Sequence, residues 1–162
     1  MQRLLLTIFV LAVFGLGWVS SSMYAVAETA NSQKPLGGES TLSTPINRVS
    51  EDKIHVYDDK IVLDVKNASW ASFTPTHSME PLISDKSHGL EVKPKSPAEI
   101  KVGDVISYSS DFTTGLVIHR VVSTGFDENG WYAVLKGDNN SEQDPGKVRF
   151  EQVNGVLIGI IY

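Results

Sequence analysis

Most apolar residues after position 53 occur in short runs that are typical of β-strands. Residues 54–57 and 61–65 flank the polar segment Asp58-Asp59-Lys60, a pattern that predicts a β-hairpin. The later runs either alternate apolar with polar positions or are rich in β-branched and aromatic side chains, as half-buried strands are. These runs cover residues 90–94, 105–108, 116–122 and 131–135.

The remaining pattern also favours strands and turns over helices. Asp127-Glu128-Asn129-Gly130 is a turn signal, and residues 153–162 predict a final strand, or a pair of strands if Asn154-Gly155 is a turn. No stretch after Ala27 has the periodicity of an amphipathic helix, and residues 99–102 are too short to assign. We therefore expect a mainly β domain of antiparallel sheet, folded into a barrel or sandwich.

The N-terminus has a different pattern. Arg3 precedes an uncharged apolar stretch, residues 4–19, and Ala25-Val26-Ala27 before Glu28 has the small-x-small form of a signal-peptide cleavage site. Residues 4–27 are also long enough to span a bilayer, which takes about 20 largely apolar residues. Both interpretations keep Arg3 cytoplasmic and the rest of the chain extracytoplasmic. We expect a single-pass membrane anchor over residues 1–27, with a cleavable signal peptide as the alternative.

Composition sets the domain organisation and excludes some functions. Residues 28–50 are rich in Ser, Thr, Gly, Pro and Asn and predict a flexible linker, which leaves residues 51–162 as one domain. The chain has 162 residues and a net charge of −5, which argues against a nucleic-acid partner. It has no cysteine, so neither a disulfide framework nor a thiolate metal site can form.

A serine, a histidine and two aspartates stand in distinctive short segments. Ser78 lies in Thr76-His77-Ser78-Met79-Glu80-Pro81, and His119 lies in the apolar run 117–122. Asp138 follows in Gly137-Asp138-Asn139-Asn140, and Asp144 precedes Pro145-Gly146. A hydrolase uses these side chains to attack a carbonyl near neutral pH: a hydroxyl nucleophile, an imidazole base and a carboxylate that orients the imidazole.

These segments, together with Gly103-Asp104, resemble the signal peptidase I superfamily of serine proteases over residues 73–162. The likeness is to the branch of archaea and the endoplasmic reticulum, because His119 occupies the position where the bacterial branch has a lysine base. The resemblance implies a signal-peptidase-like barrel or sandwich preceded by one N-terminal transmembrane or signal helix. It also implies a membrane-anchored endopeptidase that needs no cofactor and cleaves signal peptides.

The resemblance assigns a role to each candidate residue. Ser78 is the nucleophile and His119 is the general base. Asp144 matches the usual partner of the histidine, whereas Asp138 lies in a turn-rich segment that favours a structural role; both stay candidates for the third member. The Thr76 hydroxyl and the backbone N–H of Ser78 are the expected oxyanion donors. Met79 is expected to form a wall of the substrate groove, although core packing would also explain it.

A metal site is the competing chemistry. No His-x-x-x-His or His-Glu-x-x-His spacing occurs, so we predict no metal centre. The oxygen-bearing side chains of residues 138–140 and 144 leave a calcium site open, although the EF-hand pattern is absent. Glycosylation sequons begin at Asn67 and Asn139, and a glycan at Asn139 would obstruct the predicted site.

The expected partners are therefore the membrane and protein substrates that present an extended strand with small residues before the scissile bond. Two departures from the resembling family leave substrate preference open: His77 replaces a small residue before the serine, and the interval 82–102 is long. They motivate one alternative, an inactive module of the same fold that binds peptides or proteins. A soluble secreted serine protease, cleaved after Ala27, is the other.

Overall fold

The computed structural model describes residues 43–162. The predicted anchor or signal peptide and most of the predicted linker lie outside these residues. The described part contains three short 3-10 helices, η1 (Glu51–Lys53), η2 (Pro97–Glu99) and η3 (Phe150–Gln152). Its strands are β1 (Ile54–Val56), β2 (Ile61–Leu63), β3 (Ala68–Ser72), β4 (His88–Val92), β5 (Val105–Ser109), β6 (Leu116–Asp127), β7 (Gly130–Lys136), β8 (Val148–Arg149) and β9 (Val153–Ile161).

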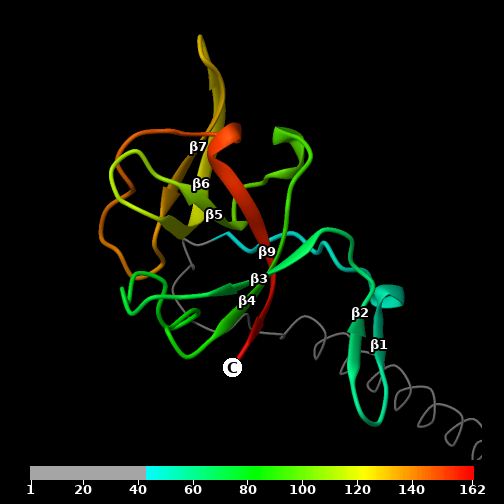
Figure 1. The fold of residues 1–162 in the computed structure, drawn as a ribbon. Helices are drawn as coiled ribbons and strands as arrows, with labels where there is room; N and C mark the ends of the chain where they lie inside the picture. Colours follow the sequence, from blue (N-terminus) through cyan, green and yellow to red (C-terminus); the bar gives the residue numbers. More distant parts are fainter. Residues whose placement is uncertain (1–42) are drawn as a thin grey trace, which may run out of the picture. The chain divides into compact units, whose positions relative to one another are not determined.

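The strands form a small hairpin and one larger sheet, and every pairing is antiparallel (Figure 1). The hairpin is β1–β2, and the larger sheet has the order β3-β4-β9-β5-β6-β7-β8. The final strand β9 is therefore inserted between β4 and β5. The prediction of a mainly β domain built from antiparallel sheet is confirmed.

Strand β5 lies in the middle of the larger sheet, and both of its faces are covered. Val105 packs with Met79 and Ile83 in one hydrophobic cluster, whereas Ile106 and Tyr108 belong to a second cluster. Adjacent strand residues point to opposite faces, so β5 separates the two clusters. The second cluster is the larger; its buried members are Ile100, Ile106, Tyr108, Val121, Ala133, Leu135, Val148, Val153 and Val156.

The long strand β6 joins the centre of the sheet to an outer hairpin. Its first half pairs with β5 and its second half with β7, and the register shifts between Val121 and Ser123. The turn predicted at residues 127–130 connects β6 to β7, with Gly130 at a φ of 96° that favours glycine.

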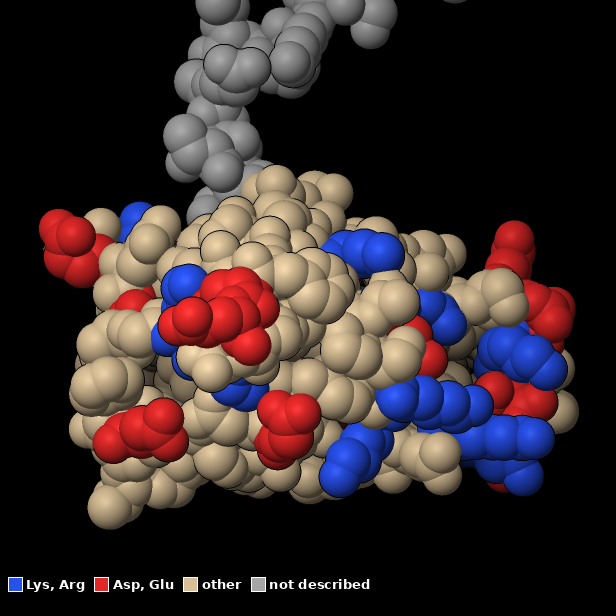
Figure 2. Space-filling model, turned by 90° about the horizontal axis from the view of Figure 1, so that it is seen from above, with Lys and Arg blue, Asp and Glu red and all other residues tan. Residues whose placement is uncertain are grey.

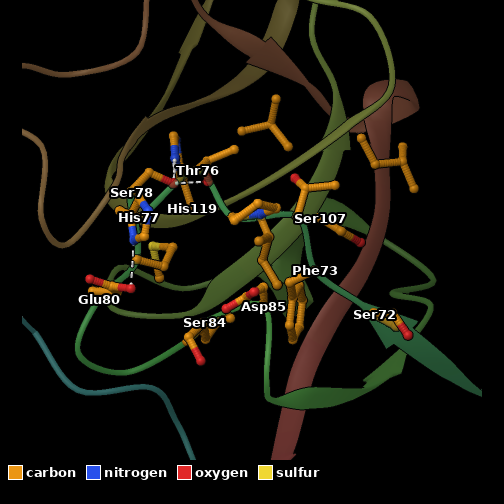
Figure 3. A pocket seen from close by; sticks show the side chains of 18 of the residues that line it. Ser72, Phe73, Thr76, His77, Ser78, Glu80, Ser84, Asp85, Ser107 and His119 are labelled. Carbon is orange, nitrogen blue, oxygen red and sulfur yellow. Dashed lines mark hydrogen bonds and ion pairs between the residues drawn. The ribbon is translucent and has the colours of Figure 1, made fainter.

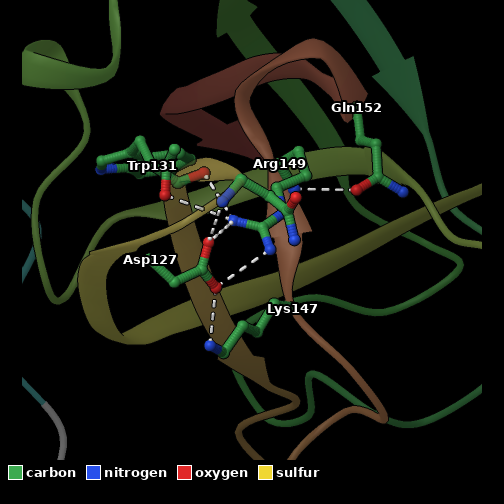
Figure 4. Close-up of polar contacts among 7 residues, drawn as sticks. Asp127, Trp131, Lys147, Arg149 and Gln152 are labelled. Carbon is green, nitrogen blue, oxygen red and sulfur yellow. Dashed lines mark hydrogen bonds and ion pairs between the residues drawn. The ribbon is translucent and has the colours of Figure 1, made fainter.

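An ion-pair cluster fixes this hairpin to β8 (Figure 4). The Arg149 guanidinium donates to both carboxylate oxygens of Asp127 at 2.8 and 3.0 Å, and Lys147 donates to Asp127 at 2.8 Å. The Lys147 ammonium also lies 4.0 Å from the centre of the Tyr132 ring. The bonds from Arg149 and Lys147 hold the pKa of Asp127 well below its usual range, because both cations stabilise the charged carboxylate.

Several sequence predictions can be compared with individual strands. The hairpin around residues 58–60 is observed, and so are strands at residues 90–94, 105–108, 116–122 and 131–135, with ends shifted by a few residues. The alternative of two strands in 153–162 is wrong, because Asn154-Gly155 lies inside the single strand β9. Strands β3 and β8 were not predicted. Serine and alanine dilute the apolar pattern in β3, and β8 is only two residues long.

Contacts with the domain begin before the predicted boundary at residue 51. The Ile46 N–H donates to Asp104 at 3.3 Å, and Arg48 forms an ion pair with the same carboxylate, which is fully buried. Gly103, at a φ of 99°, leaves the space that this segment needs, since a Cβ there would lie 2.4 Å from the Thr44 carbonyl oxygen. Residues 43–48 are therefore held against the loop that precedes β5.

The surface carries both signs of charge. On the face shown in Figure 2, acidic side chains are spread widely, and basic side chains lie toward both ends but are more numerous toward one. Within residues 43–162, no helix has the length and apolar character needed to cross a membrane.

Candidate active site

The loop between β3 and β4 carries Ser78, and the loop after β7 holds it in position. The Asn139 N–H donates to the Ser78 carbonyl oxygen at 2.9 Å, and the Asn139 side-chain amide donates to the His77 carbonyl oxygen at 3.0 Å. Gly137 packs so closely that a Cβ there would lie 2.6 Å from the Ser78 carbonyl oxygen. The position of the serine is thus set by a segment about 60 residues further along the chain.

His119 lies next to this serine. It is on β6 opposite Ile106, and its Nε2 atom lies 3.0 Å from Ser78 Oγ (Figure 3). Its other ring nitrogen, Nδ1, lies 2.6 Å from Asp144 Oδ2. The side chains of His119 and Asp144 are 9% and 11% exposed, so their hydrogen bond is largely shielded from water. Because Nδ1 bonds a carboxylate, the neutral ring carries its proton there and leaves Nε2 free to accept one.

Asp144 is fixed by two further hydrogen bonds. Its own N–H donates to the Leu135 carbonyl oxygen at 2.8 Å, which ties the loop to the end of β7. The buried Tyr108 hydroxyl donates to Asp144 Oδ2, also at 2.8 Å. Burial and the neighbouring carboxylate raise the pKa of Tyr108 well above its usual range, so the phenol stays protonated and remains a donor.

Asp138 is not brought to His119. Its carboxylate accepts two hydrogen bonds from Arg120, from Nε at 2.7 Å and from Nη2 at 2.6 Å, and both side chains are 7% exposed. Arg120 also donates to the Gly103 carbonyl oxygen at 2.8 Å. The two aspartates that the sequence left in competition therefore have different partners. Asp144 contacts the histidine, whereas Asp138 binds Arg120, which also joins β6 to the Gly103 turn.

Thr76 and Met79 flank Ser78 in the sequence and differ in what they contact. Thr76 Oγ1 is 3.2 Å from Ser78 Oγ, so the two hydroxyl groups share a hydrogen bond. Met79 is 2% exposed and packs against Ile83 and Val105. Its sulfur also lies 3.4 Å from the Asp138 backbone nitrogen. Met79 also lines the cavity beside Ser78, so it is both a core residue and part of the cavity wall.

His77 points away from Ser78 Oγ and His119, toward Glu80. Its φ of 60° is rare for a residue other than glycine, and its Nδ1 lies 2.8 Å from Glu80 Oε1 (Figure 3). The hydrogen bond and charge of Glu80 raise the pKa of the His77 imidazole. This histidine is therefore bonded to the carboxylate at the end of its own turn.

A cavity of about 400 Å³ opens beside Ser78 and His119. Its apolar lining includes Phe73, Met79, Ile83, Leu116, Val117 and Ile118. The wall also includes Ser107 on β5 and Glu91 on β4. A volume of this size lies within the usual range of ligand-binding pockets.

The described residues do not gather metal-binding side chains. Within residues 43–162, no three His, Asp or Glu side chains are arranged to hold a metal ion. The carboxylates considered for calcium have other partners, since Asp138 is bound by Arg120 and Asp144 by His119 and Tyr108. Asn139, at the second sequon, uses its side-chain amide to bond the His77 carbonyl.

Sequence reasoning did not single out Tyr108, Arg120 or Glu91. Arg120 directly follows the predicted base, and a charged residue in a buried β-like run is a signal that a partner is needed. Tyr108 and Glu91 gave no such signal, because their partners lie 36 and 16 residues away on other elements.

Comparison with protein-family models, with curated proteins and with solved structures returned no match for this chain.

Proposed function

We propose that this chain is a serine endopeptidase of the signal peptidase I superfamily, of the archaeal and endoplasmic-reticulum type. The supporting observation is the hydrogen-bonded series Ser78 Oγ to His119 Nε2 at 3.0 Å and His119 Nδ1 to Asp144 Oδ2 at 2.6 Å. A general base must lie within hydrogen-bond reach of the proton that it removes, and His119 meets this requirement. The adjoining cavity provides room for a peptide substrate.

The acylation step follows from these positions. As Ser78 Oγ forms a bond to the scissile carbonyl carbon, its proton passes to His119 Nε2. Asp144 keeps the proton on Nδ1 and stabilises the imidazolium that forms. When the C–N bond breaks, the imidazolium returns the proton from Nε2 to the leaving amine. The products of this step are the free amine and an ester on Ser78.

The negative charge that develops on the substrate oxygen needs hydrogen-bond donors. The backbone N–H of Ser78 and the Thr76 hydroxyl are the proposed donors. Thr76 Oγ1 lies 3.2 Å from Ser78 Oγ, which puts it near the atoms that react. One donor of this kind typically contributes about 3 kcal/mol of transition-state stabilisation.

Deacylation repeats the same proton transfers with water. His119 Nε2 takes a proton from water as the oxygen of that water attacks the ester carbon. The imidazolium then protonates Ser78 Oγ as the C–O bond breaks. A carboxylic acid leaves and the free enzyme is restored, so no cofactor is consumed.

The cellular setting belongs to the same proposal. The substrates are signal peptides of exported proteins, presented as an extended strand with small residues before the scissile bond. The domain adopts a signal-peptidase-like barrel or sandwich. Residues 4–27 anchor it as a single-pass membrane protein, with the catalytic domain outside the cytoplasm. Amino-terminal sequencing of the mature protein tests the anchor, because a chain that begins at Glu28 would instead be a secreted protease.

A covalent probe tests the reaction. A fluorophosphonate should label Ser78, as located by mass spectrometry of the labelled peptide, and Ser78→Ala should abolish labelling. His119→Ala should remain folded but lose labelling and signal-peptide cleavage, whereas the matched variant His77→Ala should keep most of both. A folded wild-type protein that is neither labelled nor able to cleave would reject the protease and favour the peptide-binding module.

A further inference from the structure

The cavity beside Ser78 contains a buried carboxyl group that the proposed reaction does not use. Glu91 is 6% exposed and lines the cavity from β4. Its Oε2 atom accepts a hydrogen bond from the Ser107 hydroxyl at 2.8 Å. Its Oε1 atom is buried and has no hydrogen-bond partner among residues 43–162. Buried polar atoms without a partner are uncommon and expensive, so this one calls for an explanation.

The fold makes room for this carboxyl group. Strand β9 lies between β4 and β5, and its residue opposite Ser107 is Gly155. A Cβ at Gly155 would lie 2.7 Å from Glu91 Oε2 and 3.0 Å from the Glu91 Cβ. The glutamate can therefore cross β9 to reach Ser107 only because this position has no side chain. Ser107 borders the same cavity as Ser78 and His119 (Figure 3).

The cavity lining is rich in carboxyl groups. Glu80, Asp85 and Glu91 line it, and its lining contains no lysine or arginine. Two imidazoles also line it, but His77 is bonded to Glu80 and His119 to Asp144. Burial raises the pKa of Glu91, and the bond from Ser107 only partly opposes this effect. Glu91 thus has no cationic partner among the residues around the cavity.

A ligand that carries a positive charge would supply the missing partner. A buried carboxylate is costly when unpaired, and an ammonium or guanidinium group that enters the cavity beside it recovers Coulombic energy. We propose that Glu91 and Ser107 form a specificity subsite for a lysine or arginine side chain of the substrate. This inference rests on the proposed peptidase function and specifies its substrates further.

The subsite is compatible with a small residue at the scissile bond. Alternate side chains of an extended strand point to the same side, so a substrate can present a small residue near Ser78 and a longer one deeper in the cavity. At about 400 Å³, the cavity is far larger than an alanine side chain requires. The expected substrates therefore combine a small residue at the bond with a basic residue among those that precede it.

A paired set of peptides tests this assignment. Lysine and norleucine have similar length and differ in charge, and each is placed in turn at the five positions before the bond. At one position the lysine peptide should have at least about a tenfold higher kcat/KM than the norleucine peptide. Glu91→Gln, which keeps the shape and can still accept from Ser107, should reduce this ratio to near one. Glu151→Gln, at an exposed residue that does not line the cavity, should keep it.

Two further measurements make the test independent of turnover and of variant folding. The Ser78→Ala protein should bind the lysine peptide more tightly than the norleucine peptide, whether or not the native chain is a protease. With the unaltered protein, n-butylammonium should compete for this site and n-butanol should not. Equal binding of the two peptides, or a lysine preference unchanged in Glu91→Gln, would overturn the assignment. Absence of fluorophosphonate labelling at Ser78 would reject the peptidase function alone.

Discussion

The Tyr108 hydroxyl donates a hydrogen bond to Asp144 Oδ2, the same oxygen that lies 2.6 Å from His119 Nδ1. Tyr108 is on β5 and His119 is on β6, so two neighbouring strands hold one carboxylate from different directions. A carboxylate fixed in this way can keep the imidazole in one orientation. Tyr108 is therefore a positioning residue in the proposed mechanism, acting on His119 through Asp144.

Replacing Tyr108 with phenylalanine should affect turnover more than substrate binding. The variant keeps the ring in the core but removes the hydrogen bond, at a cost to stability of about 1 kcal/mol. We expect kcat to fall by about ten- to hundredfold through misplacement of the imidazole, with KM little changed. Steady-state kinetics on a signal-peptide substrate will measure kcat and KM separately. Tyr57→Phe, at an exposed tyrosine in the hairpin loop, is the matched control, and equal kcat values for the two variants would remove Tyr108 from the mechanism.

Substitutions of the two aspartates should have different effects, one mainly on turnover and the other on stability. Asp144→Asn cannot stabilise the His119 cation and can hold the ring in the wrong tautomer, so kcat should fall by about 10⁴-fold while the domain stays folded. Asp138→Asn leaves the buried Arg120 guanidinium without its counter-charge, which typically costs about 3 to 5 kcal/mol of stability. Thermal melting beside turnover for each variant distinguishes these outcomes. A stable but inactive Asp138→Asn protein would reverse the two roles.

The antiparallel β character could be predicted because it is carried by local patterns, and local patterns also supplied the candidate residues, with Asp138 and Asp144 both left open. Residues 116–122 show β-branched enrichment, and Ser78, His119 and Asp144 each lie in a recognisable short segment. Their partners could not be predicted in the same way. The bond between Tyr108 and Asp144 depends on where the loop after β7 meets β5, which only the tertiary fold determines.

Two local predictions, a turn at Asn154-Gly155 and a linker over residues 43–48, differ from the structure for physical reasons. Asn154-Gly155 is a strong local turn signal, but Gly155 is required inside β9 because Glu91 crosses over it. Residues 43–48 have a linker-like composition, yet the buried Asp104 carboxylate binds both Ile46 and Arg48. In both places a long-range contact overrides the local preference of the chain.

His77 and Glu80 should form a titratable pair beside Ser78. Glu80 raises the pKa of His77 above its ordinary value of 6.5. A raised histidine pKa means that the pair stabilises the folded state fully below the unfolded pKa, and that this contribution is lost as pH rises through the folded-state pKa. An NMR titration of the His77 ring should show a pKa above 6.5 that falls toward this value in Glu80→Gln. Asp85→Asn, which removes a weaker contributor, is the control, and a Glu80→Gln protein with an unchanged His77 titration would contradict the pairing.

Adding a methyl group at Gly137 should disturb Ser78 without touching the serine side chain. The new Cβ would lie 2.6 Å from the Ser78 carbonyl oxygen, so either the loop that carries Ser78 or the segment around residue 137 has to move. Overpacking of this kind typically lowers stability by about 1 to 3 kcal/mol. A small displacement of Ser78 from His119 should separately slow acylation. We expect Gly137→Ala to react with the fluorophosphonate at least about tenfold more slowly at a temperature where it is fully folded. Gly159→Ala is the matched control, because its nearest neighbour would be Leu90 Cδ1 at an ordinary 3.7 Å. Labelling of Gly137→Ala at the wild-type rate would show that the segment after β7 does not set the position of Ser78.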